Sequence, residues 1–385
     1  MNTLLIALGV FGLLGALTVS FLFFRGIRFL KSLSGVSPLP SALSLPKITL
    51  IAAARNEERH IERATLSLLK QDYPNLEVLI VNDRSTDRTG AILEKLQKQE
   101  PRLKVKTIRE LPAGWLGKCY ALSEGAREAL GEWILFTDAD VIFDPTALRR
   151  AMAHIELEHL DHLAVIPDNR MPGLVLPAFV VHFAISFSLL TRIWKIRDPK
   201  SPEHVGIGAF NLVRAALYRK AGGHEKIRLR PDDDLKLGKI IKQAGGSQDV
   251  LLGDEFVVVE WYASVWELVR GLEKNSFAGV DYRWSLVIAG TVAQLLTFSW
   301  PWLGIWIGPP VARLFCLGAA VLMAIVYGVQ AAKLRTPRAS AIFFPFMALL
   351  FMAIAWRAVL LTVARGGIEW RGTRYSLDQL KANKV

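Results

Sequence analysis

The chain has 385 residues, 52% of them hydrophobic, with a mean hydropathy of +0.30, which allows one large or two ordinary domains and is high for a soluble protein. The net charge of +12 fits basic flanks of membrane segments and attraction to anionic lipids and substrates; no basic helix with interleaved aromatic residues, zinc finger or RNA-recognition motif points to a nucleic-acid partner. The two cysteines, Cys119 and Cys316, lie far apart and predict neither a disulfide framework nor a zinc cluster, which fits a reducing compartment.

An uncharged apolar run at residues 3–24 is followed at once by Arg25, Arg28 and Lys31. The run is long enough to cross a hydrocarbon layer of ~30 Å. A signal peptide would carry its positive charge before the run and a cleavage site of small residues after it. We therefore predict an uncleaved membrane anchor over residues 1–31, with the N-terminus outside and the next segment in the cytoplasm.

After a linker rich in Ser, Gly and Pro at residues 32–46, short apolar strands alternate with helical spacing. We expect strands at residues 48–54, 76–81, 105–108 and 133–137, and helices at 57–71, at 117–130, and from a cap at Ser85 or Thr86 to about residue 98. This alternation predicts the α/β class, with a doubly wound and mainly parallel sheet.

Polar residues follow three of these strands at the points where the strands end, at residues 55–58, 82–87 and 138–140. Ligands bind beyond the carboxyl ends of the strands in such sheets. We therefore expect the three polar segments to form one site at that edge.

The remaining apolar segments raise the question of how often the chain crosses the membrane. Residues 173–196 are interrupted by His182 and flanked by polar sequence, so a spanning helix would place the two halves of the soluble domain on opposite faces. We favour an interfacial or partly re-entrant helix there, with a buried core helix as the alternative. The other apolar segments lie near residues 286–308, 312–332 and 341–363.

The basic loop between the last two segments predicts a cytoplasmic position, in agreement with a cytoplasmic domain at residues 47–285 of a protein of the inner membrane. If all three segments within 286–364 cross, the basic tail at residues 365–385 lies outside, against the positive-inside rule. One re-entrant segment would remove this conflict, and the side of the tail stays open.

Two carboxylates, Asp138 and Asp140, stand at the end of the apolar strand 133–137. In a strand such residues point the same way, about 7 Å apart along the chain. A hard divalent cation held by carboxylates neutralises a diphosphate leaving group, and carboxylates favour Mg²⁺ or Mn²⁺ over Zn²⁺. We predict that this pair holds one of these cations; a solvated loop is the alternative.

Lys118 follows a glycine-containing turn and is the candidate cation for a phosphate. It is not a Walker A lysine, because Pro112 replaces the required glycine and no Ser or Thr follows. No dinucleotide-binding glycine pattern follows the first strand either, which argues against NAD and ATP hydrolysis. Asp83 after the second strand is either a turn acid or an acceptor of hydrogen bonds from a base or ribose.

Three consecutive acids, Asp232, Asp233 and Asp234, precede a helix expected at residues 235–244. The helix dipole favours acids there, and one of these carboxylates can act as a general base toward a hydroxyl. A plain surface loop is the alternative. Upstream, Gly206 and Gly208 permit a close backbone approach before an apolar strand.

The motifs at residues 54–58, 81–89, 114–118, 137–140, 222–224 and 233–237 resemble those of family 2 inverting glycosyltransferases of the GT-A fold. The resemblance covers about residues 47–285. The stretch 112–118, the three C-terminal apolar segments and the tail motif at 369–375 are most similar to the hopene-associated, carotenoid and ceramide glucosyltransferase subgroup.

The resemblance implies a role for each acid. Asp83 would bind the uracil–ribose part of a UDP-sugar, Asp138 the ribose or donor sugar, and Asp140 the metal. Asp234, or its neighbour Asp233, would deprotonate the acceptor hydroxyl. The expected nucleotide-sugar-binding residues are Arg55, Asn56, Glu57, Asp83, Ser85, Lys118 and Asp138.

The sequence departs from the family pattern at three places. Asn82 stands where an acid is usual, and Asp233 replaces a glutamate, which leaves the base assignment uncertain by one residue. The Gln/Arg-x-x-Arg-Trp motif is represented at best by residues 267–271 without its tryptophan, so we place Arg270 and Trp266 on the acceptor and diphosphate side. These departures weaken the case for a processive polymer synthase.

We therefore expect a membrane glycosyltransferase that moves a sugar from a nucleotide-sugar donor to a lipid hydroxyl, of hopanoid, carotenoid, sphingolipid or glycerolipid type. A processive polysaccharide synthase and a non-catalytic sugar-nucleotide-binding membrane protein are the alternatives. A transporter is disfavoured by the few apolar segments and the lack of internal repeats. The oligomeric state is left open.

Overall fold

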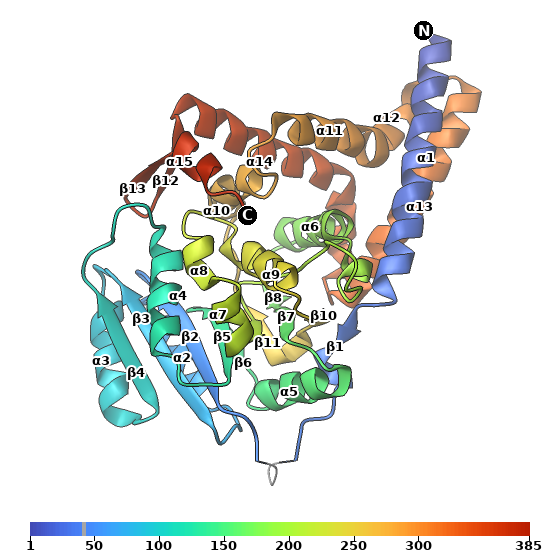
Figure 1. Ribbon diagram of the computed structural model, residues 1–385. Coiled ribbons are helices and arrows are strands. Elements are labelled where there is room, and N and C mark those ends of the chain that lie inside the picture. Colours follow the sequence, from blue (N-terminus) through green and yellow to red (C-terminus); the bar gives the residue numbers. More distant parts are fainter. Residues whose placement is uncertain (41–43) are drawn as a thin grey trace. The chain divides into compact units, whose positions relative to one another are not determined.

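The structure, a computed structural model, describes residues 1–40 and 44–385; residues 41–43 of the expected linker lie outside it. The chain divides into two units (Figure 1). We call Leu30–Arg170, Ile193–Glu260 and Ala382–Val385 the sheet unit, and Met1–Phe29, Met171–Arg192 and Trp261–Lys381 the helical unit.

An eight-stranded sheet in the order β1-β10-β7-β9-β5-β2-β3-β4 forms the centre of the sheet unit. Its strands are β1 (Lys31–Ser32), β2 (Ile48–Ala54), β3 (Leu76–Asp83), β4 (Leu103–Ile108), β5 (Trp133–Asp138), β7 (His162–Ile166), β9 (Asn211–Arg214) and β10 (Gln248–Leu252). All neighbouring strands are parallel except at β9, which is antiparallel to both β5 and β7. The prediction of a mainly parallel sheet is confirmed.

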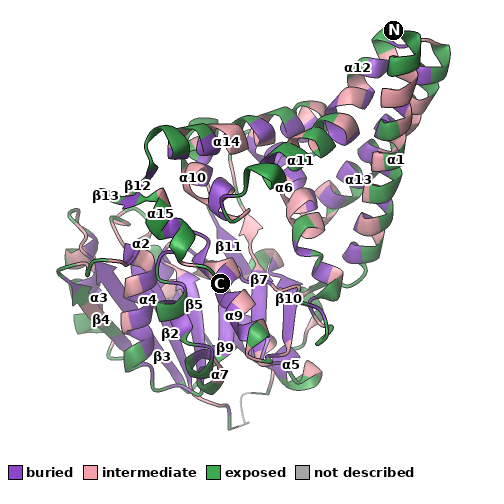
Figure 2. Ribbon diagram, turned by 45° about the horizontal axis from the view of Figure 1, so that its top comes forward, coloured by how far each residue is buried: buried purple, intermediate pink, exposed green. Residues whose placement is uncertain are grey.

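Helices flank this sheet, and strands β2 and β3 are buried along their whole length, as parallel strands covered on both faces should be (Figure 2). The helices are α2 (Ile61–Leu69), α3 (Thr89–Gln99), α4 (Gly117–Glu128), α5 (Ala147–Glu158), α7 (Ala215–Lys220), α8 (Gly223–Lys226) and α9 (Asp233–Gln243). Three short 3₁₀ turns (Leu33–Gly35, Ile193–Lys195 and Asp254–Phe256) and a small sheet of β6 (Ile142–Phe143), β11 (Val257–Val259) and β8 (Asp168–Asn169) complete the unit.

Helix α3 begins later than the sequence predicted. The expected caps, Ser85 and Thr86, lie in the loop, and the helix starts at Thr89. The Asp87 carboxylate accepts a hydrogen bond of 2.9 Å from the Thr89 N–H. The prediction was wrong because Ser85 and Thr86 are instead engaged with the loop that follows β2.

The register of the sheet aligns the strand ends. Ala53 pairs with Asp138 across β2 and β5, and Ala54 pairs with Asn82 across β2 and β3. The polar segments that follow these three strands therefore start from one edge of the sheet, and the site is built there.

The helical unit contains α1 (Asn2–Ile27), α6 (Val175–Thr191), α10 (Val265–Ala278), α11 (Trp284–Gln294), a π-helical turn (Leu295–Ser299), α12 (Trp300–Ile307), α13 (Pro310–Lys333), a 3₁₀ turn (Arg338–Phe343), α14 (Phe344–Ala364), the hairpin β12 (Gly367–Trp370) and β13 (Thr373–Ser376), and α15 (Leu377–Ala382). Among the described residues, five helical stretches are long and apolar enough to cross a membrane: Asn2–Ile27, Val175–Lys195, Trp284–Ile307, Pro310–Lys333 and Arg338–Ala364.

Small residues allow α1 to pack closely against its neighbours in this unit. A Cβ added to Gly9 would lie 3.2 Å from the Ala312 carbonyl oxygen, and one added to Gly12 would lie 3.0 Å from that of Leu296. Figure 1 shows α1 and α13 side by side. Close backbone approach through small residues is typical of helix packing in lipid, where apolar burial provides no drive for association.

Candidate functional site

Hydrogen bonds join the loops after β2 and β3. The Asn56 side-chain oxygen accepts a hydrogen bond of 2.8 Å from the Thr86 N–H, and the Asn56 N–H donates one of 3.1 Å to Ser85 Oγ. The Glu57 N–H donates to Thr89 Oγ1 at 2.8 Å. Asn56 has a φ of 56°, which asparagine tolerates better than most residues. The structure thus brings together the residues that the sequence assigned to the first two polar segments.

Asp83 is buried at the end of β3 and lies between two arginines. Its carboxylate accepts hydrogen bonds of 2.7 and 3.2 Å from Arg84, and Arg55 Nη1 lies 3.8 Å from Asp83 Oδ2. A Cβ added to Gly117 would lie 2.4 Å from Asp83 Oδ2, so the first turn of α4 passes directly over this carboxylate. Only glycine at position 117 allows this approach.

Lys118, the next residue of α4, connects two of the acidic segments. Its ammonium lies 2.7 Å from Asp138 Oδ1 and 3.6 Å from Asp233 Oδ2. Burial by itself would lower the pKa of Lys118, but the charges of Asp138, Asp233 and Asp234 outweigh burial and raise the pKa above its usual value. Lys118 is therefore a fixed positive charge among carboxylates.

Asp140 is a carboxylate whose surroundings disfavour its negative charge. Burial, together with the charge of Asp138, raises the pKa of Asp140 to about 6. No group of three or more His, Cys, Asp or Glu able to hold a metal occurs among the described residues 1–40 and 44–385. A pair of carboxylates fits Mg²⁺ or Mn²⁺, which usually take one or two protein carboxylates and complete their shell with substrate phosphates and water.

The acids at the start of α9 meet the backbone that precedes β9. Asp234 Oδ2 accepts a hydrogen bond of 2.8 Å from the Gly208 N–H, and Asp234 Oδ1 accepts one of 2.7 Å from the Leu235 N–H. Burial raises the pKa of Asp234, and the positive charge of Lys118 opposes that rise. A Cβ on Gly208 would lie 2.6 Å from Asp138 Oδ2 and 3.4 Å from Asp234 Oδ2, so Gly208 separates these two carboxylates.

The sequence predicts that Asp138 and Lys118 bind a nucleotide-sugar, and Gly208→Ala is then expected to weaken that binding and sugar transfer by at least about tenfold, because its methyl group would push Asp138 away from Lys118. The backbone of Gly208 needs no positive φ, so we expect the variant to fold. Isothermal titration measures the affinity for the donor, and a melting curve shows whether the variant folds. Gly290→Ala is the matched control, since a Cβ added at Gly290 would meet no atom of a neighbouring element within 4 Å. Equal donor affinity in the two variants would contradict this role of Gly208.

Arg270 and Trp266 both belong to α10 in the helical unit. The Arg270 guanidinium lies 4.9 Å from the centre of the Trp266 ring, and that of Arg357 lies 5.3 Å from it. The two predicted residues therefore contact each other, and their place on the acceptor and diphosphate side stays a prediction.

Sequence reasoning missed three contributors to this site. Arg84 donates a hydrogen bond to Asp83. The Coulomb interaction with His60 lowers the pKa of Asp140. Asn211 donates a hydrogen bond of 3.3 Å to the Asp234 carbonyl. Arg84 stands directly beside Asp83 in the sequence, so a search for cations next to each acid would have found it. His60 and Asn211 reach the acids only through the fold.

Residues 49–221 match the glycosyl transferase family 2 domain. The 4,4'-diaponeurosporenoate glycosyltransferase of Staphylococcus aureus is 24% identical over 347 residues, which cover 86% of this chain and 89% of that protein. The beta-monoglucosyldiacylglycerol synthase of Synechocystis is 35% identical over 152 residues, which cover 38% of this chain and 30% of that protein.

Among solved structures, a mannosyltransferase from Pyrobaculum calidifontis in complex with GDP-Man and Mn²⁺ is similar, with a TM-score of 0.56 and 19% identity over 93% of this chain and 99% of that one. At this identity the likeness concerns the fold. The sheet, the domain match and the named relatives agree: this chain carries a glycosyl transferase family 2 domain with the GT-A fold and is a glycosyltransferase.

Proposed function

We propose that the protein transfers a hexose, with inversion, from a nucleotide-sugar, most simply a UDP-hexose, to a hydroxyl group of a membrane lipid. The observation that carries the proposal is the combination of a glycosyltransferase sheet unit with five apolar helical stretches in one chain. A hydrophobic acceptor stays in the bilayer, so an enzyme that acts on it must be held at the membrane. The two named relatives, whose names specify a carotenoid acid and a glucosyldiacylglycerol, support a lipid acceptor.

The donor would lie along the edge formed by β2, β3 and β5. Asp83, held between two arginines, would bind the base and ribose. Arg55, Asn56, Glu57 and Ser85 form the braced loops beside it. Lys118 would neutralise one negative charge of the diphosphate. Asp138 and Asp140 would hold a divalent cation, Mg²⁺ or Mn²⁺, which when bound neutralises the charge that develops on the leaving diphosphate.

Asp234 would act as the general base toward the acceptor hydroxyl. Asp234 keeps some solvent exposure as a residue, and its carboxylate accepts from two backbone N–H groups, whereas the carboxylate of Asp233 is buried against Lys118. Inversion requires the hydroxyl to attack the anomeric carbon opposite the diphosphate. The base takes the hydroxyl proton while the bond to the diphosphate breaks. Burial keeps the pKa of Asp234 above its usual value, which suits a base that must accept a proton.

We further propose that the sheet unit is cytoplasmic in a protein of the inner membrane, and that the chain crosses an even number of times after residue 261. Residues from Leu30–Arg170, Ile193–Glu260 and Ala382–Val385 form one compact unit, which cannot be divided by a bilayer. Helix α6 must then return to the side it left, as an interfacial or re-entrant helix. Two of the three C-terminal apolar stretches cross, which keeps the basic tail inside, in accord with the positive-inside rule.

A thiol-labelling experiment tests this topology. A cysteine at Lys384 is expected to react with a membrane-impermeant reagent only in inverted vesicles, and a cysteine at the exposed Asn2 only in intact cells; both native cysteines are buried and serve as background. Labelling of position 384 from outside would contradict the even number of crossings.

The purified protein in detergent or vesicles tests the function itself. It is supplied with UDP-hexoses or GDP-mannose, Mg²⁺ or Mn²⁺, and extracted polar and neutral lipids, and products are identified by mass spectrometry. We expect a single hexose added to a lipid with an inverted anomeric centre. A ladder of long glycan chains would instead indicate a polysaccharide synthase, and donor binding without either transfer or hydrolysis would indicate a non-catalytic protein.

A further inference from the structure

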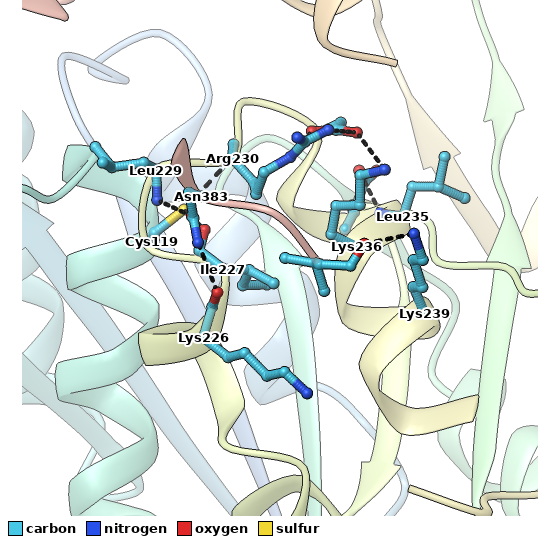
Figure 3. A network of polar contacts seen from close by, with 12 residues as sticks. Cys119, Lys226, Ile227, Leu229, Arg230, Leu235, Lys236, Lys239 and Asn383 are labelled. Carbon is cyan, nitrogen blue, oxygen red and sulfur yellow. Dashed lines mark hydrogen bonds and ion pairs between the residues drawn. The ribbon is translucent and has the colours of Figure 1, made fainter. Parts of the chain in front are cut away.

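The last residues of the described chain belong to the sheet unit, where Asn383 holds the loop between α8 and α9. We call residues 227–232 the base loop. The Asn383 side-chain oxygen accepts a hydrogen bond of 2.9 Å from the Leu229 N–H, and its amide nitrogen donates one of 2.9 Å to the Lys226 carbonyl (Figure 3). One side-chain amide thus satisfies a backbone donor and a backbone acceptor three residues apart.

A second contact fixes the segment that carries Asn383. Lys239 Nζ on α9 lies 2.5 Å from the Val385 carbonyl oxygen, and the partly buried Val385 side chain packs against the core of the sheet unit. The segment Ala382–Val385 therefore has an anchor on each side of the base loop: one on the loop itself and one on the helix that follows it.

Helix α4 holds the base loop from another side. The Leu116 N–H donates a hydrogen bond of 2.8 Å to the Arg228 carbonyl, and Cys119 Sγ lies 3.6 Å from the carbonyl oxygens of Ile227 and Arg230. Leu116 lies two residues before Lys118, and Cys119 follows it directly. Asn383 and the first turn of α4 thus fix the loop between them.

The base loop leads directly into the acids of the site. Arg230 is buried and donates two hydrogen bonds of 2.9 Å to the Asp232 carboxylate, and Lys236 Nζ lies 3.6 Å from the same carboxylate. Asp232 is the residue at the N-terminus of α9, and Asp233 and Asp234 follow as the first two helical residues. The position of the loop therefore determines where the first turn of α9 places its carboxylates.

We propose that Asn383 is a positioning residue for sugar transfer: its amide clamps the base loop so that the first turn of α9 presents Asp234 to the acceptor. The inference rests on the proposed function, in which this acid is the base. It assigns a role in the reaction to a segment that follows the helical unit in the sequence, far from every motif of the glycosyltransferase domain.

The backbone hydrogen bonds of the base loop depend on Asn383. Leu229 is buried, so without the Asn383 oxygen its N–H loses its hydrogen bond, and the loop must move to reach water. Displacement of a catalytic group by about 1 Å can cost a factor of about 10² in rate. The proposed donor residues are Asp83, Lys118, Asp138 and the loops after β2 and β3. Asn383 makes no hydrogen bond to any of them among the described residues, so its loss should leave donor binding in place.

The test uses the full-length protein in vesicles with the lipid acceptor and four chains: wild type, Asn383→Ala, Asn383→Asp and Lys384→Ala. Lys384 is the neighbouring residue, its side chain is exposed, and it serves as the matched control. We expect Asn383→Ala to lower kcat by about tenfold or more with the donor Kd unchanged and only a small fall in melting temperature from the lost hydrogen bonds. Asn383→Asp keeps the oxygen that accepts from Leu229 and is expected to recover part of kcat. Hydrogen–deuterium exchange at the Leu229 amide should be faster in Asn383→Ala than in the control.

Three results would overturn the positioning role: kcat equal in Asn383→Ala and Lys384→Ala, a parallel loss of donor affinity and melting temperature, or unchanged exchange at Leu229. A wild-type protein that transfers no sugar to lipid would refute the proposed function instead. In that case the exchange measurement still decides whether Asn383 clamps the loop.

Discussion

Asp234→Asn is expected to lower kcat for transfer by about 10²–10⁴-fold, the usual contribution of a general base, with little change in the Kd of the nucleotide-sugar. The amide cannot take the proton of the acceptor hydroxyl, yet it fills the same volume and can still accept from the Gly208 N–H. Transfer is measured with saturating donor and lipid, and donor binding is measured by isothermal titration on the same preparation.

Asp233→Asn is the control that decides between the two neighbouring acids. Because the Asp233 carboxylate lies 3.6 Å from Lys118, its loss should mainly weaken donor binding. A larger kcat defect in Asp233→Asn than in Asp234→Asn would reassign the base to Asp233. A melting temperature lowered in both variants without a specific kinetic defect would show the acids to be structural.

The pH dependence of the wild type follows from the direction of the Asp234 pKa. Burial raises the pKa of Asp234 above the usual value of an aspartate, and a base works only when deprotonated. We expect kcat to fall as the pH falls through this raised pKa, and the acidic limb to disappear in Asp234→Asn. A limb that remains unchanged in the variant would belong to another group.

Asp140→Asn is expected to abolish the dependence of transfer on a divalent cation and to reduce transfer by about 10²–10³-fold, since a bound cation contributes several kcal/mol of charge stabilisation in the transition state. Binding of Mn²⁺, followed by electron paramagnetic resonance in the presence of UDP, should weaken in parallel. Glu132→Gln, an exposed acid just before the opposite end of β5, is the matched control. Full activity and unchanged Mn²⁺ binding in Asp140→Asn would refute the metal assignment.

The same variant is expected to be more stable than the wild type when no divalent cation is present. The pKa of Asp140 is raised to about 6 by burial and by the charge of Asp138, so ionisation of Asp140 opposes folding. This penalty is absent below the unfolded pKa of about 4 and complete above pH 6. Asp140→Asn should therefore gain roughly 1–3 kcal/mol at pH 7 in EDTA and nothing at pH 4. Denaturant unfolding at the two pH values measures the difference, and an equal gain at both would exclude this cause.

Much of the sheet unit could be predicted because its signals are local. The apolar runs that became β2, β3 and β5 are bounded by polar residues, and the parallel arrangement places the polar ends of all three strands at one edge. A few consecutive residues are enough to recognise each of the other site features: the acids after each strand, Lys118, and the acid triplet before α9. The close approach at Gly208 was likewise predicted from a short motif, and the structure places it between Asp138 and Asp234.

The rest depends on contacts between distant residues, which no local pattern encodes. Strand β9 pairs antiparallel with β5 and β7, which lie far from it in the sequence. Ser85 and Thr86 failed as helix caps because Asn56 competes for them. The pairing of Lys118 with Asp138 and Asp233 requires three elements to be folded together.

The sequence by itself determined the family resemblance, the chemistry of the acids and the number of apolar segments, since each follows from residue type and spacing along the chain. Only the tertiary structure decided that the residues after α15 return to the sheet unit, where Asn383 meets Leu229 across 154 positions of sequence. An asparagine near the end of a basic tail carries no sign of its partner. Its amide finds partners only when folding places it beside the Leu229 N–H and the Lys226 carbonyl.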